Sequence, residues 1–379
     1  MVTRLDTRCH SLTLTLDLAI FSLQKMGGIS VVWREYLSRL LPLARKNALP
    51  LKILLPENEN MAAQELEFPP DQTISLSPLK TLGKYLPSTY RGSRNEILHM
   101  SYYRSYPLFQ GKKVVTVHDF VDHYCDGRLK KWLHGTLKYR SMKESDLILC
   151  ISETTREDLL KFHPDLAGRD IRVIANAVGD EFYPDPSDQA PLPPYLLWVG
   201  GRAAYKNFSY ALQLFQATRS KIPELVLVVV GPPFSKEERK EMATLGLQDC
   251  VQLEHHADQS KLRGLYSNAL ALLYLSRYEG FGIPVLEAQR CRCPVICLPI
   301  PAMQEVARDT ALYLTEQDSD LSGLLTLLVE PESREHLISQ GLKNVQRYSW
   351  SRSFEKLMEA YCDLGWHTSN QESTAGRKL

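Results

Sequence analysis

The sequence lacks an excess of charge of either sign, a long apolar run and an ordered set of cysteines, and each absence excludes a class of protein. The 45 Lys and Arg residues nearly balance the 44 Asp and Glu residues, so the net charge is only +1 and no overall field attracts nucleic acid. No segment approaches the roughly 20 consecutive apolar residues of a transmembrane helix. We therefore expect neither a nucleic-acid partner nor a membrane span.

The eight cysteines follow neither a disulfide framework nor a zinc pattern. Most lie inside apolar runs, and we find no secretory signal before them, which predicts a reduced, cytoplasmic setting. Cys291, Cys293 and Cys297 are neighbours in sequence, but they lead into an expected strand, so we interpret them as packing residues.

What the sequence does contain is an alternation of short apolar runs and amphipathic stretches, which is typical of parallel α/β units. The expected strands of the first half are Leu12–Phe21, Leu51–Leu55, Glu96–Met100, Lys113–Val117, Leu147–Ile151 and Arg172–Ile174, with a helix over Gly28–Leu41. The expected strands of the second half are Tyr195–Val199, Leu225–Val230, Val251–Leu253, Ala269–Leu275, Val295–Leu298 and Ala311–Leu314, with a helix from Asn207.

A proline-rich stretch, Phe182–Pro194, has the composition of a linker between the two halves. We therefore expect a first domain over residues 1–185, a second over 186–348, an amphipathic closing helix over 349–366 and a polar tail over 367–379. Two α/β domains joined by a hinge imply a cleft, and open α/β sheets bind ligands beyond the carboxyl ends of their strands.

The most informative stretch places Glu279 and Glu287 eight positions apart around the turn Gly280-Phe281-Gly282. An apolar strand leads into this turn, and Pro284 suits the first turn of a following helix. Such a turn presents backbone N–H groups at a positive helix end, where a phosphate or sugar hydroxyl is held. Two carboxylates about two helical turns apart suit a ligand with two polar ends, such as a nucleotide-sugar. The alternative is a surface helix with solvated glutamates.

A glycine pair, Gly200-Gly201, follows the strand that opens the second half; Arg202 comes directly after it, and Lys206 lies four residues further on. Arg offers a planar fork and Lys a point charge, so the two cations indicate a diphosphate site. They would also stabilise the charge that develops on a leaving diphosphate. The alternative is a pair of exposed surface cations.

Further motifs follow strands of the first half. Gly27-Gly28 precedes the first helix, where glycines either allow close approach of a ligand or simply form a tight turn. In His118-Asp119 the imidazole could hydrogen-bond a sugar hydroxyl, and the alternative is a capping pair.

A metal site formed by His118 and His123 needs both histidines on one face, which the loop does not ensure. Asp318-Ser319-Asp320 has the D-x-D form of a metal motif, but helix capping explains it, so no metal site is expected.

In chain order, over about Leu12–Leu364, these motifs resemble the retaining glycosyltransferases of family 4 (glycosyl transferases group 1), whose E-x7-E signature matches Glu279 and Glu287. The first half is most similar to bacterial polysaccharide and O-antigen mannosyltransferases. The resemblance implies an α/β protein of the GT-B fold, in which two Rossmann-like, doubly wound domains face a central cleft and a C-terminal helix crosses back to the first domain.

The resemblance also implies residue roles. Arg202 and Lys206 would bind the diphosphate, Glu287 the ribose hydroxyls, and both Glu279 and His118 would lie near the donor sugar. The expected site comprises His118, Arg202, Lys206 and Glu279 as catalytic residues, with Gly27, Gly28, Gly201, Gly280, Phe281, Gly282 and Glu287 as donor-binding residues.

Two positions depart from the family pattern. Ala177, in Asn176-Ala177-Val178, replaces a family glycine. In Pro301–Val306 only Glu305 matches the family's segment, and no function is assigned to it.

The predicted function is transfer of a hexose, with mannose favoured, from a nucleotide-diphosphate sugar to a hydroxyl of a glycan or lipid-linked acceptor in cell-surface polysaccharide synthesis. GDP-mannose is the favoured donor, and no metal or other cofactor is expected. The alternatives are an epimerase or phosphorylase of the same fold, and a sugar-nucleotide-binding protein without activity. The basic segment Gly127–Lys143, which contains no acidic residue, has two open interpretations: a helix resting on anionic lipid at the inner membrane face, or a solvated helix.

Overall fold

The structure, a computed structural model, describes residues 12–77, 86–124, 128–185, 193–255, 257–316 and 321–366. The Asp318-Ser319-Asp320 motif and the tail 367–379 lie outside these residues, as do Gly127 and the side chains of residues 128–134. Within the described ranges, no helix is both long enough and apolar enough to cross a membrane.

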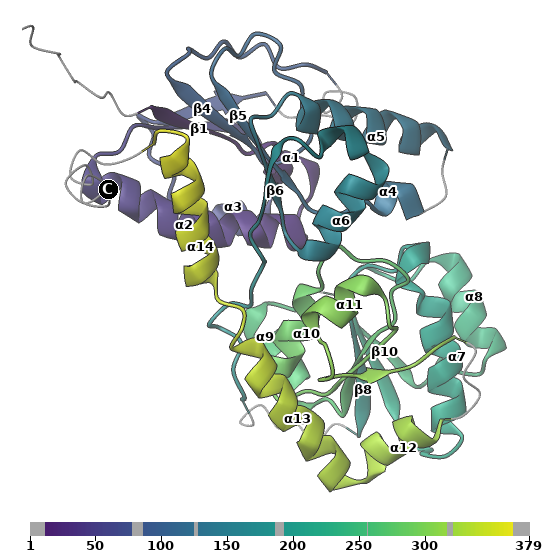
Figure 1. Cartoon of the computed structure of the whole chain (residues 1–379). Helices are drawn as coiled ribbons and strands as arrows, with labels where there is room; N and C mark the ends of the chain where they lie inside the picture. Colours follow the sequence, from purple (N-terminus) through teal and green to yellow (C-terminus); the bar gives the residue numbers. More distant parts are fainter. Residues whose placement is uncertain are drawn as a thin grey trace, which may run out of the picture.

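The chain folds into two domains, each built on a parallel sheet flanked by helices (Figure 1). The first sheet has the strand order β3-β2-β1-β4-β5-β6-β7 and the second the order β10-β9-β8-β11-β12-β13. In the first sheet the strands are β1 Thr13–Asp17, β2 Leu51–Pro56, β3 Thr73–Leu76, β4 Glu96–Met100, β5 Lys112–Val117, β6 Leu147–Cys150 and β7 Asp170–Val173. In the second they are β8 Tyr195–Val199, β9 Val226–Val230, β10 Val251–Glu254, β11 Ala271–Tyr274, β12 Val295–Cys297 and β13 Leu312–Tyr313.

The helices alternate with the strands, as parallel pairing requires. Those of the first domain are α1 Ala19–Leu23, α2 Gly28–Asn47, α3 Met61–Gln64, α4 Val121–Tyr124, α5 Arg128–Lys143 and α6 Glu153–Phe162. Those that follow are α7 Phe208–Arg219, α8 Lys236–Thr244, α9 Gln259–Asn268, α10 Ile283–Arg290, α11 Pro301–Val306, α12 Ser322–Val329, α13 Pro331–Val345 and α14 Trp350–Asp363. The predicted α/β class and two-domain fold are confirmed.

The strand order reverses once in each sheet, between β1 and β4 in the first and between β8 and β11 in the second. At such a switch point the connections leave in opposite directions, so a crevice opens beyond the carboxyl ends of the two strands. The motif loops singled out in the second half follow β8 and β11. The topology therefore places them at the crevice of the second sheet.

The expected first strand is wrong in its second half. Only Thr13–Asp17 is extended, and the following residues form α1. The Asp17 carboxylate accepts a hydrogen bond from the Ala19 amide at 3.0 Å, a local contact that turns the chain. Since Leu18–Phe21 is buried throughout, its apolar run carries no periodicity that distinguishes a strand from a helix.

The strand β3 was not expected from the sequence. It lies at the edge of the first sheet, where it pairs with β2. Ile74 in its centre is 40% exposed, so this short strand lacks the apolar run that identified the others.

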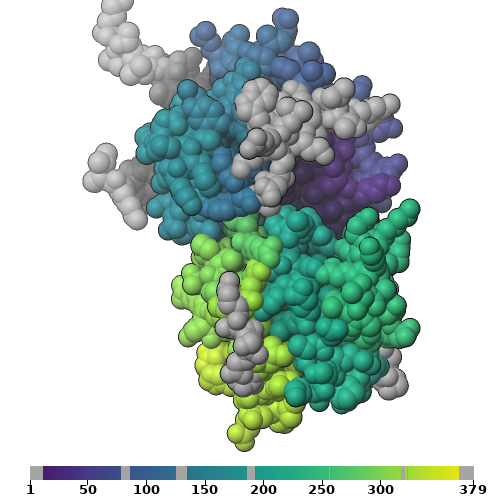
Figure 2. All heavy atoms as spheres, turned by 90° about the vertical axis from the view of Figure 1, so that its right-hand side faces the viewer, coloured from purple at the N-terminus to yellow at the C-terminus, as the bar shows by residue number. Residues whose placement is uncertain are grey.

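The closing helix α14 returns to the first domain, as predicted, and lies beside α2 (Figure 1). The Trp350 ring packs edge-on against Tyr36 of α2 at 5.7 Å between centroids. The Tyr361 hydroxyl lies 2.5 Å from Nδ1 of His99 in β4. In Figure 2 the two domains form two lobes, and the chain between α13 and α14 passes from the second domain to the first (Figure 1).

Candidate active site

The second-domain loops that carry the predicted donor residues come together at the carboxyl edge of the sheet. Lys206 ends a single 3-10 turn after β8, and Glu279 lies in the loop after the neighbouring strand β11. The Lys206 ammonium lies 2.5 Å from Glu279 Oε1. It also lies 5.6 Å from the centre of the Tyr274 ring. This ion pair joins the loop after β8 to the loop after β11.

Arg202 is buried rather than displayed on the surface. Only 3% of its side chain is exposed, and its Nε donates to Glu238 Oε1 at 2.7 Å. The guanidinium lies 5.5 Å from the Phe208 ring centre and 4.7 Å from that of Phe234. Burial raises the pKa of Glu238, but the contacts from Arg202 and Ser235 outweigh it and hold that pKa below its ordinary value. A freely exposed cation is therefore excluded at this position.

One edge of the Arg202 guanidinium still has donor capacity. Its Nη1 is buried and, among the residues that the structure describes, has no hydrogen-bond partner. This atom lies beside Gly231, whose Cβ, if present, would be 3.1 Å from it. Buried donors are normally satisfied, so Nη1 is available to an anionic ligand group at the end of β9.

The signature turn depends on glycine in two places. Gly282 has φ of 114° and precedes α10 as its N-cap, a backbone conformation that L side chains rarely adopt. Gly280 packs so closely on the first domain that a Cβ would lie 2.0 Å from the His118 carbonyl oxygen. The two predicted site elements, the His118 loop and the Glu279 loop, are therefore in direct contact across the domain boundary.

Glu287 is buried on α10, and Tyr266 donates a hydrogen bond of 2.8 Å to its Oε2. Burial, reinforced by the charge of Glu181, raises the pKa of Glu287 to about 7, although the Tyr266 bond and Arg34 oppose the shift. A solvated surface glutamate is thus excluded. At neutral pH this carboxyl is poised between its two protonation states, both of which can hydrogen-bond a hydroxyl.

His118 follows β5 and is 5% exposed. Burial, together with the charge of Lys138, lowers its pKa to about 3, so its imidazole is neutral at physiological pH. Its Nε2 is buried without a hydrogen-bond partner in the described part of the chain. A neutral imidazole with one unpaired nitrogen is suited to a hydrogen bond with a ligand.

Residues 181–344 match the family described as "Glycosyl transferases group 1". The matched segment is less than half of the chain and contains the second-domain loops described above. Glu279 and Glu287 both lie inside the matched segment.

Among similar proteins, the O-antigen chain mannosyltransferase RfbU of Salmonella typhimurium is 29% identical over 225 residues, which are 59% of this chain and 62% of that protein. The O-antigen chain mannosyltransferase B of Escherichia coli is 25% identical over 66% of this chain and 70% of its own length. The GDP-mannose:cellobiosyl-diphosphopolyprenol alpha-mannosyltransferase of Xanthomonas campestris is 30% identical over 54% of each chain. The chain thus spans less than two thirds of the first of these relatives.

Solved structures show the same fold. The sucrose-phosphate synthase of Thermosynechococcus elongatus has a TM-score of 0.72 at 18% identity, covering 93% of this chain and 99% of that one. HepE of Anabaena, solved in complex with UDP and glucose, has a TM-score of 0.67 at 14% identity, covering 93% and 100%. At these identities the likeness concerns the fold alone, which is GT-B.

Lys138 of the basic segment points inward. Its side chain is 2% exposed and forms an ion pair with Asp122, and its ammonium donates to the Asp119 carbonyl at 2.9 Å. It also lies 4.8 Å from the Phe120 ring centre. Lys138 therefore fixes the loop after His118 instead of contributing charge to an outer helix face.

The Gly27-Gly28 loop lies after α1, not directly after β1 as expected. A Cβ on Gly27 would lie 2.2 Å from the Gln24 side chain, whereas nothing lies within 4 Å of that position on Gly28. Asn60 holds the loop by donating to the Gln24 carbonyl at 2.6 Å. The described contacts of the two glycines are local, and they do not place the pair against Lys206 or Glu279.

Sequence reasoning missed a cluster beside Glu287. Arg34 of α2 bonds Glu181 at 2.9 Å and Glu65 at 3.1 Å, and Gln259 of α9 bonds the same Glu181 oxygen at 3.2 Å. Glu181 thereby links the first domain to α9. No local pattern identifies these residues, because 147 positions separate Arg34 from Glu181.

The switch point of the first sheet holds a second polar cluster. Asp17 ends β1, while Arg104, Ser105 and Tyr106 follow β4. Arg104 Nε and Nη1 and Ser105 Oγ are buried without hydrogen-bond partners in the described ranges, and the Tyr106 hydroxyl interacts with the Asp17 carboxyl. Burial raises the pKa of Asp17, although Tyr106 and Arg104 oppose the shift. Such unmet polar atoms at a switch point indicate room for a polar ligand or ordered water.

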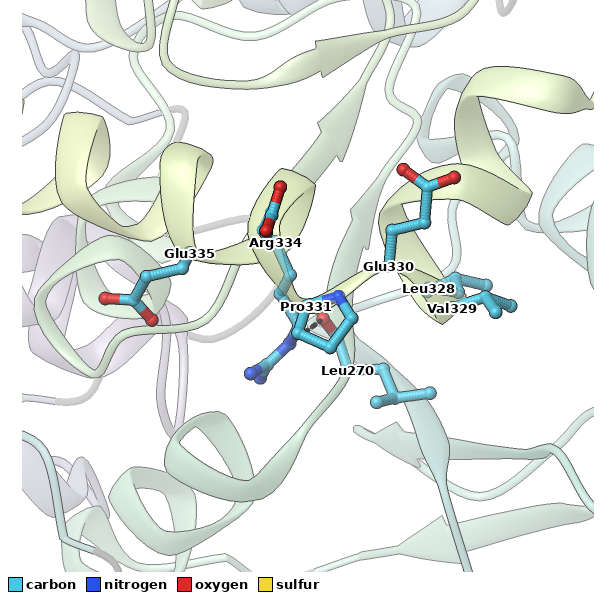
Figure 3. A pocket seen from close by; sticks show the side chains of 8 residues that line it. Leu270, Leu328, Val329, Glu330, Pro331, Arg334 and Glu335 are labelled. Carbon is cyan, nitrogen blue, oxygen red and sulfur yellow. Dashed lines mark hydrogen bonds between the residues drawn. The ribbon is translucent and has the colours of Figure 1, made fainter.

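A pocket of about 510 Å³ lies elsewhere on the second domain, between α12, α13 and the start of β11 (Figure 3). Leu270 in its lining precedes β11, so this pocket is at the amino edge of the sheet. The Arg334 guanidinium is bound there by the Ala269 carbonyl at 3.0 Å. The pocket is separate from the carboxyl edge, where the donor residues meet.

None of the described residues forms a group of three or more His, Cys, Asp or Glu that could hold a metal ion.

Proposed function

We propose that this protein transfers mannose from GDP-mannose to a hydroxyl of a glycan or lipid-linked acceptor, with retention of configuration and without a metal or other cofactor. The observation that carries the proposal is the Lys206–Glu279 pair at the carboxyl edge of the second sheet, with Arg202 on the loop after β8 and Glu287 on α10. The mannose donor is supported by the relatives, of which one is named a GDP-mannose-dependent mannosyltransferase.

The diphosphate of the donor would contact Lys206 and the unpaired Nη1 of Arg202. Both cations are held in place before the ligand binds, Lys206 by Glu279 and Arg202 by Glu238. Preorganised donors stabilise the charge that develops on a leaving diphosphate, because no rearrangement is needed during the reaction. The same contacts contribute to donor affinity through charge-assisted hydrogen bonds.

Glu287 would accept hydrogen bonds from the ribose hydroxyls. Its position on α10 is set by Gly282 and by the Tyr266 hydrogen bond. Burial makes the bare carboxylate unfavourable, and hydroxyl donors from a ligand would offset that desolvation. Donor binding should therefore favour the ionised form.

Across the cleft, His118 would hydrogen-bond the donor sugar through its neutral imidazole. The acceptor hydroxyl would attack on the face from which the diphosphate departs, and a diphosphate oxygen would receive its proton. This front-face course retains the anomeric configuration. A glycosyl adduct trapped on any carboxylate of the chain would contradict it.

The acceptor would bind the first domain, and the cluster around Asp17 and Arg104 supports this assignment. It combines a carboxyl acceptor with guanidinium and hydroxyl donors, all at the switch point. A carboxylate disfavours an anionic ligand group, so the cluster suits sugar hydroxyls.

The enzyme would act at the cytoplasmic membrane face, where residues 127–143 would contact anionic lipid. Since Lys138 is buried, other basic residues of this segment would make that contact.

Thermal unfolding with a panel of GDP-mannose, UDP-glucose and UDP-N-acetylglucosamine, with and without EDTA, tests the proposal. A donor at 100 times its Kd stabilises the folded state by about 2.7 kcal/mol. We expect GDP-mannose to raise the unfolding temperature whether or not EDTA is present. A shift only with UDP-sugars contradicts the mannose donor, a shift abolished by EDTA contradicts metal independence, and no shift contradicts the donor site.

A further inference from the structure

Tyr278 belongs to the second domain by sequence but is packed in the core of the first. It directly precedes Glu279 in the signature loop. Its side chain is 7% exposed and is part of the hydrophobic cluster that contains Phe120, Val117 and Leu159 of the first domain. Its ring stacks on Tyr124 with 4.3 Å between centroids and 20° between the planes.

The Tyr278 hydroxyl joins the two candidate catalytic loops. It accepts a hydrogen bond of 2.7 Å from the Phe120 amide, two residues after His118. It donates one of 2.8 Å to Asp158 Oδ2 on α6. Burial and the charge of Asp158 raise the pKa of Tyr278 far above its ordinary value, so the hydroxyl remains a donor at physiological pH.

Neighbouring contacts hold the same loop against α6. The Gly280 carbonyl accepts hydrogen bonds from Ser152 Oγ at 2.6 Å and from Thr155 Oγ1 at 3.1 Å. Glu305 of α11 accepts from the amides of Glu153 and Thr154 at 2.9 and 2.8 Å, at the first turn of α6. A carboxylate at a helix N-terminus is favourable, so Glu305 and the signature loop dock on one end of one helix.

We infer that Tyr278 is a positioning residue, which sets Glu279 against His118 only when the two domains are docked. The inference rests on the proposed function. One hydroxyl holds both loops, so separating the domains breaks both of its hydrogen bonds and releases the residue next to Glu279. Donor binding uses second-domain residues, whereas transfer needs both loops. Tyr278 therefore affects the catalytic step more than donor affinity.

The test compares Tyr278→Phe with Tyr124→Phe. Both remove one hydroxyl that donates to Asp158, since Tyr124 donates to its Oδ1 at 2.7 Å, and both leave the stacked rings in place. Of the two hydroxyls, only that of Tyr278 forms hydrogen bonds across the domain boundary. With GDP-mannose as donor, we expect kcat of Tyr278→Phe to fall about tenfold, the effect of one or two lost hydrogen bonds in the transition state. The donor KM should stay within about twofold, and Tyr124→Phe should resemble the wild type.

Hydrogen exchange gives a readout that does not need turnover. The Phe120 amide should lose protection in Tyr278→Phe and keep it in Tyr124→Phe, because only the first variant removes its acceptor. The double variant Tyr278→Phe/Asp158→Asn should be no worse in kcat than the more impaired single variant, since coupled residues are not additive.

Unchanged kcat in Tyr278→Phe, an equal loss in Tyr124→Phe, or a parallel loss of donor affinity would overturn the inference. Unchanged exchange at Phe120 would do so as well. A wild-type protein that neither hydrolyses nor transfers any nucleotide-sugar of the panel would instead contradict the proposed function. The two failures are therefore distinguishable.

Discussion

The Lys206 ammonium and the Glu279 carboxylate lie 2.5 Å apart, although 73 positions separate the two residues in the sequence. The pair forms because β8 and β11 are neighbours in the sheet and end at the same edge. With 21% and 12% of their side chains exposed, the two groups are screened from solvent but remain accessible to a ligand. This contact is the charged centre of the proposed donor site.

Replacing Lys206 by Ala should weaken nucleotide binding by about 10- to 100-fold, because a charge-assisted hydrogen bond to phosphate contributes about 1.5–3 kcal/mol. The fold should persist, since the side chain is partly exposed. Isothermal titration with GDP and GDP-mannose measures the effect. Lys343→Ala, at an exposed position of α13, is the control and should bind like the wild type. Equal affinity in both variants would remove Lys206 from the site.

The carboxyl of Glu287 should make stability depend on pH. Its folded pKa of about 7 lies above the ordinary value of 4.5, so the folded state binds the proton more tightly and becomes less stable as pH rises between these values. The loss is about 3 kcal/mol. Glu287→Gln should lack this dependence, which denaturant unfolding from pH 4 to 8 can measure. If the unfolding free energies of the wild type and Glu287→Gln changed with pH in parallel, the raised pKa could not be assigned to Glu287.

The affinity for the donor should rise with pH over the range in which the stability of the fold decreases. If the ionised Glu287 carboxylate accepts the ribose hydroxyls, the affinity of the wild type for GDP should rise as pH passes through about 7. In Glu287→Gln and Glu287→Ala the affinity should be lower and should lack that step. Titrations at several pH values test this, and a step that persists in Glu287→Gln would assign it to another group.

His118 should remain neutral through the physiological range. Its folded pKa of about 3 lies below the ordinary 6.5, so the wild type should lose stability as pH falls from about 6.5 towards 3, because only the unfolded chain gains the proton. His118→Asn should lose less stability over that interval and should transfer sugar more slowly. A wild-type rate profile with an acid limb near pH 6.5 that disappears in His118→Asn would contradict a neutral His118.

Adding a methyl group at Gly280 should disrupt the contact between the domains. The Cβ of Gly280→Ala would lie 2.0 Å from the His118 carbonyl, and overpacking of this kind costs about 1–3 kcal/mol. We expect at least a tenfold loss of kcat and a lower unfolding temperature. Gly168→Ala, where nothing lies within 4 Å of the added carbon, is the matched control. Wild-type activity in Gly280→Ala would show that the loops need not touch.

The strands with strong apolar runs were predictable from the sequence, and β4 occurs over the expected residues Glu96–Met100. The edge strand β3 and the helix α1 were not, because an exposed short strand and a fully buried helix both lack the periodicity that distinguishes them. Ser152 is the N-cap of α6, and its side chain accepts a hydrogen bond from the Thr155 amide. That contact is local, so the sequence carries it.

The α/β class, the glycine turns and the residue types of the donor loops follow from local sequence, since each depends on neighbours a few positions away. Which of these groups meet depends on the tertiary fold. It buries Arg202 against Glu238, turns Lys138 inward and inserts Tyr278 beside Phe120, 158 positions away. Those contacts depend on strand order and on how two domains pack, and a linear pattern records neither.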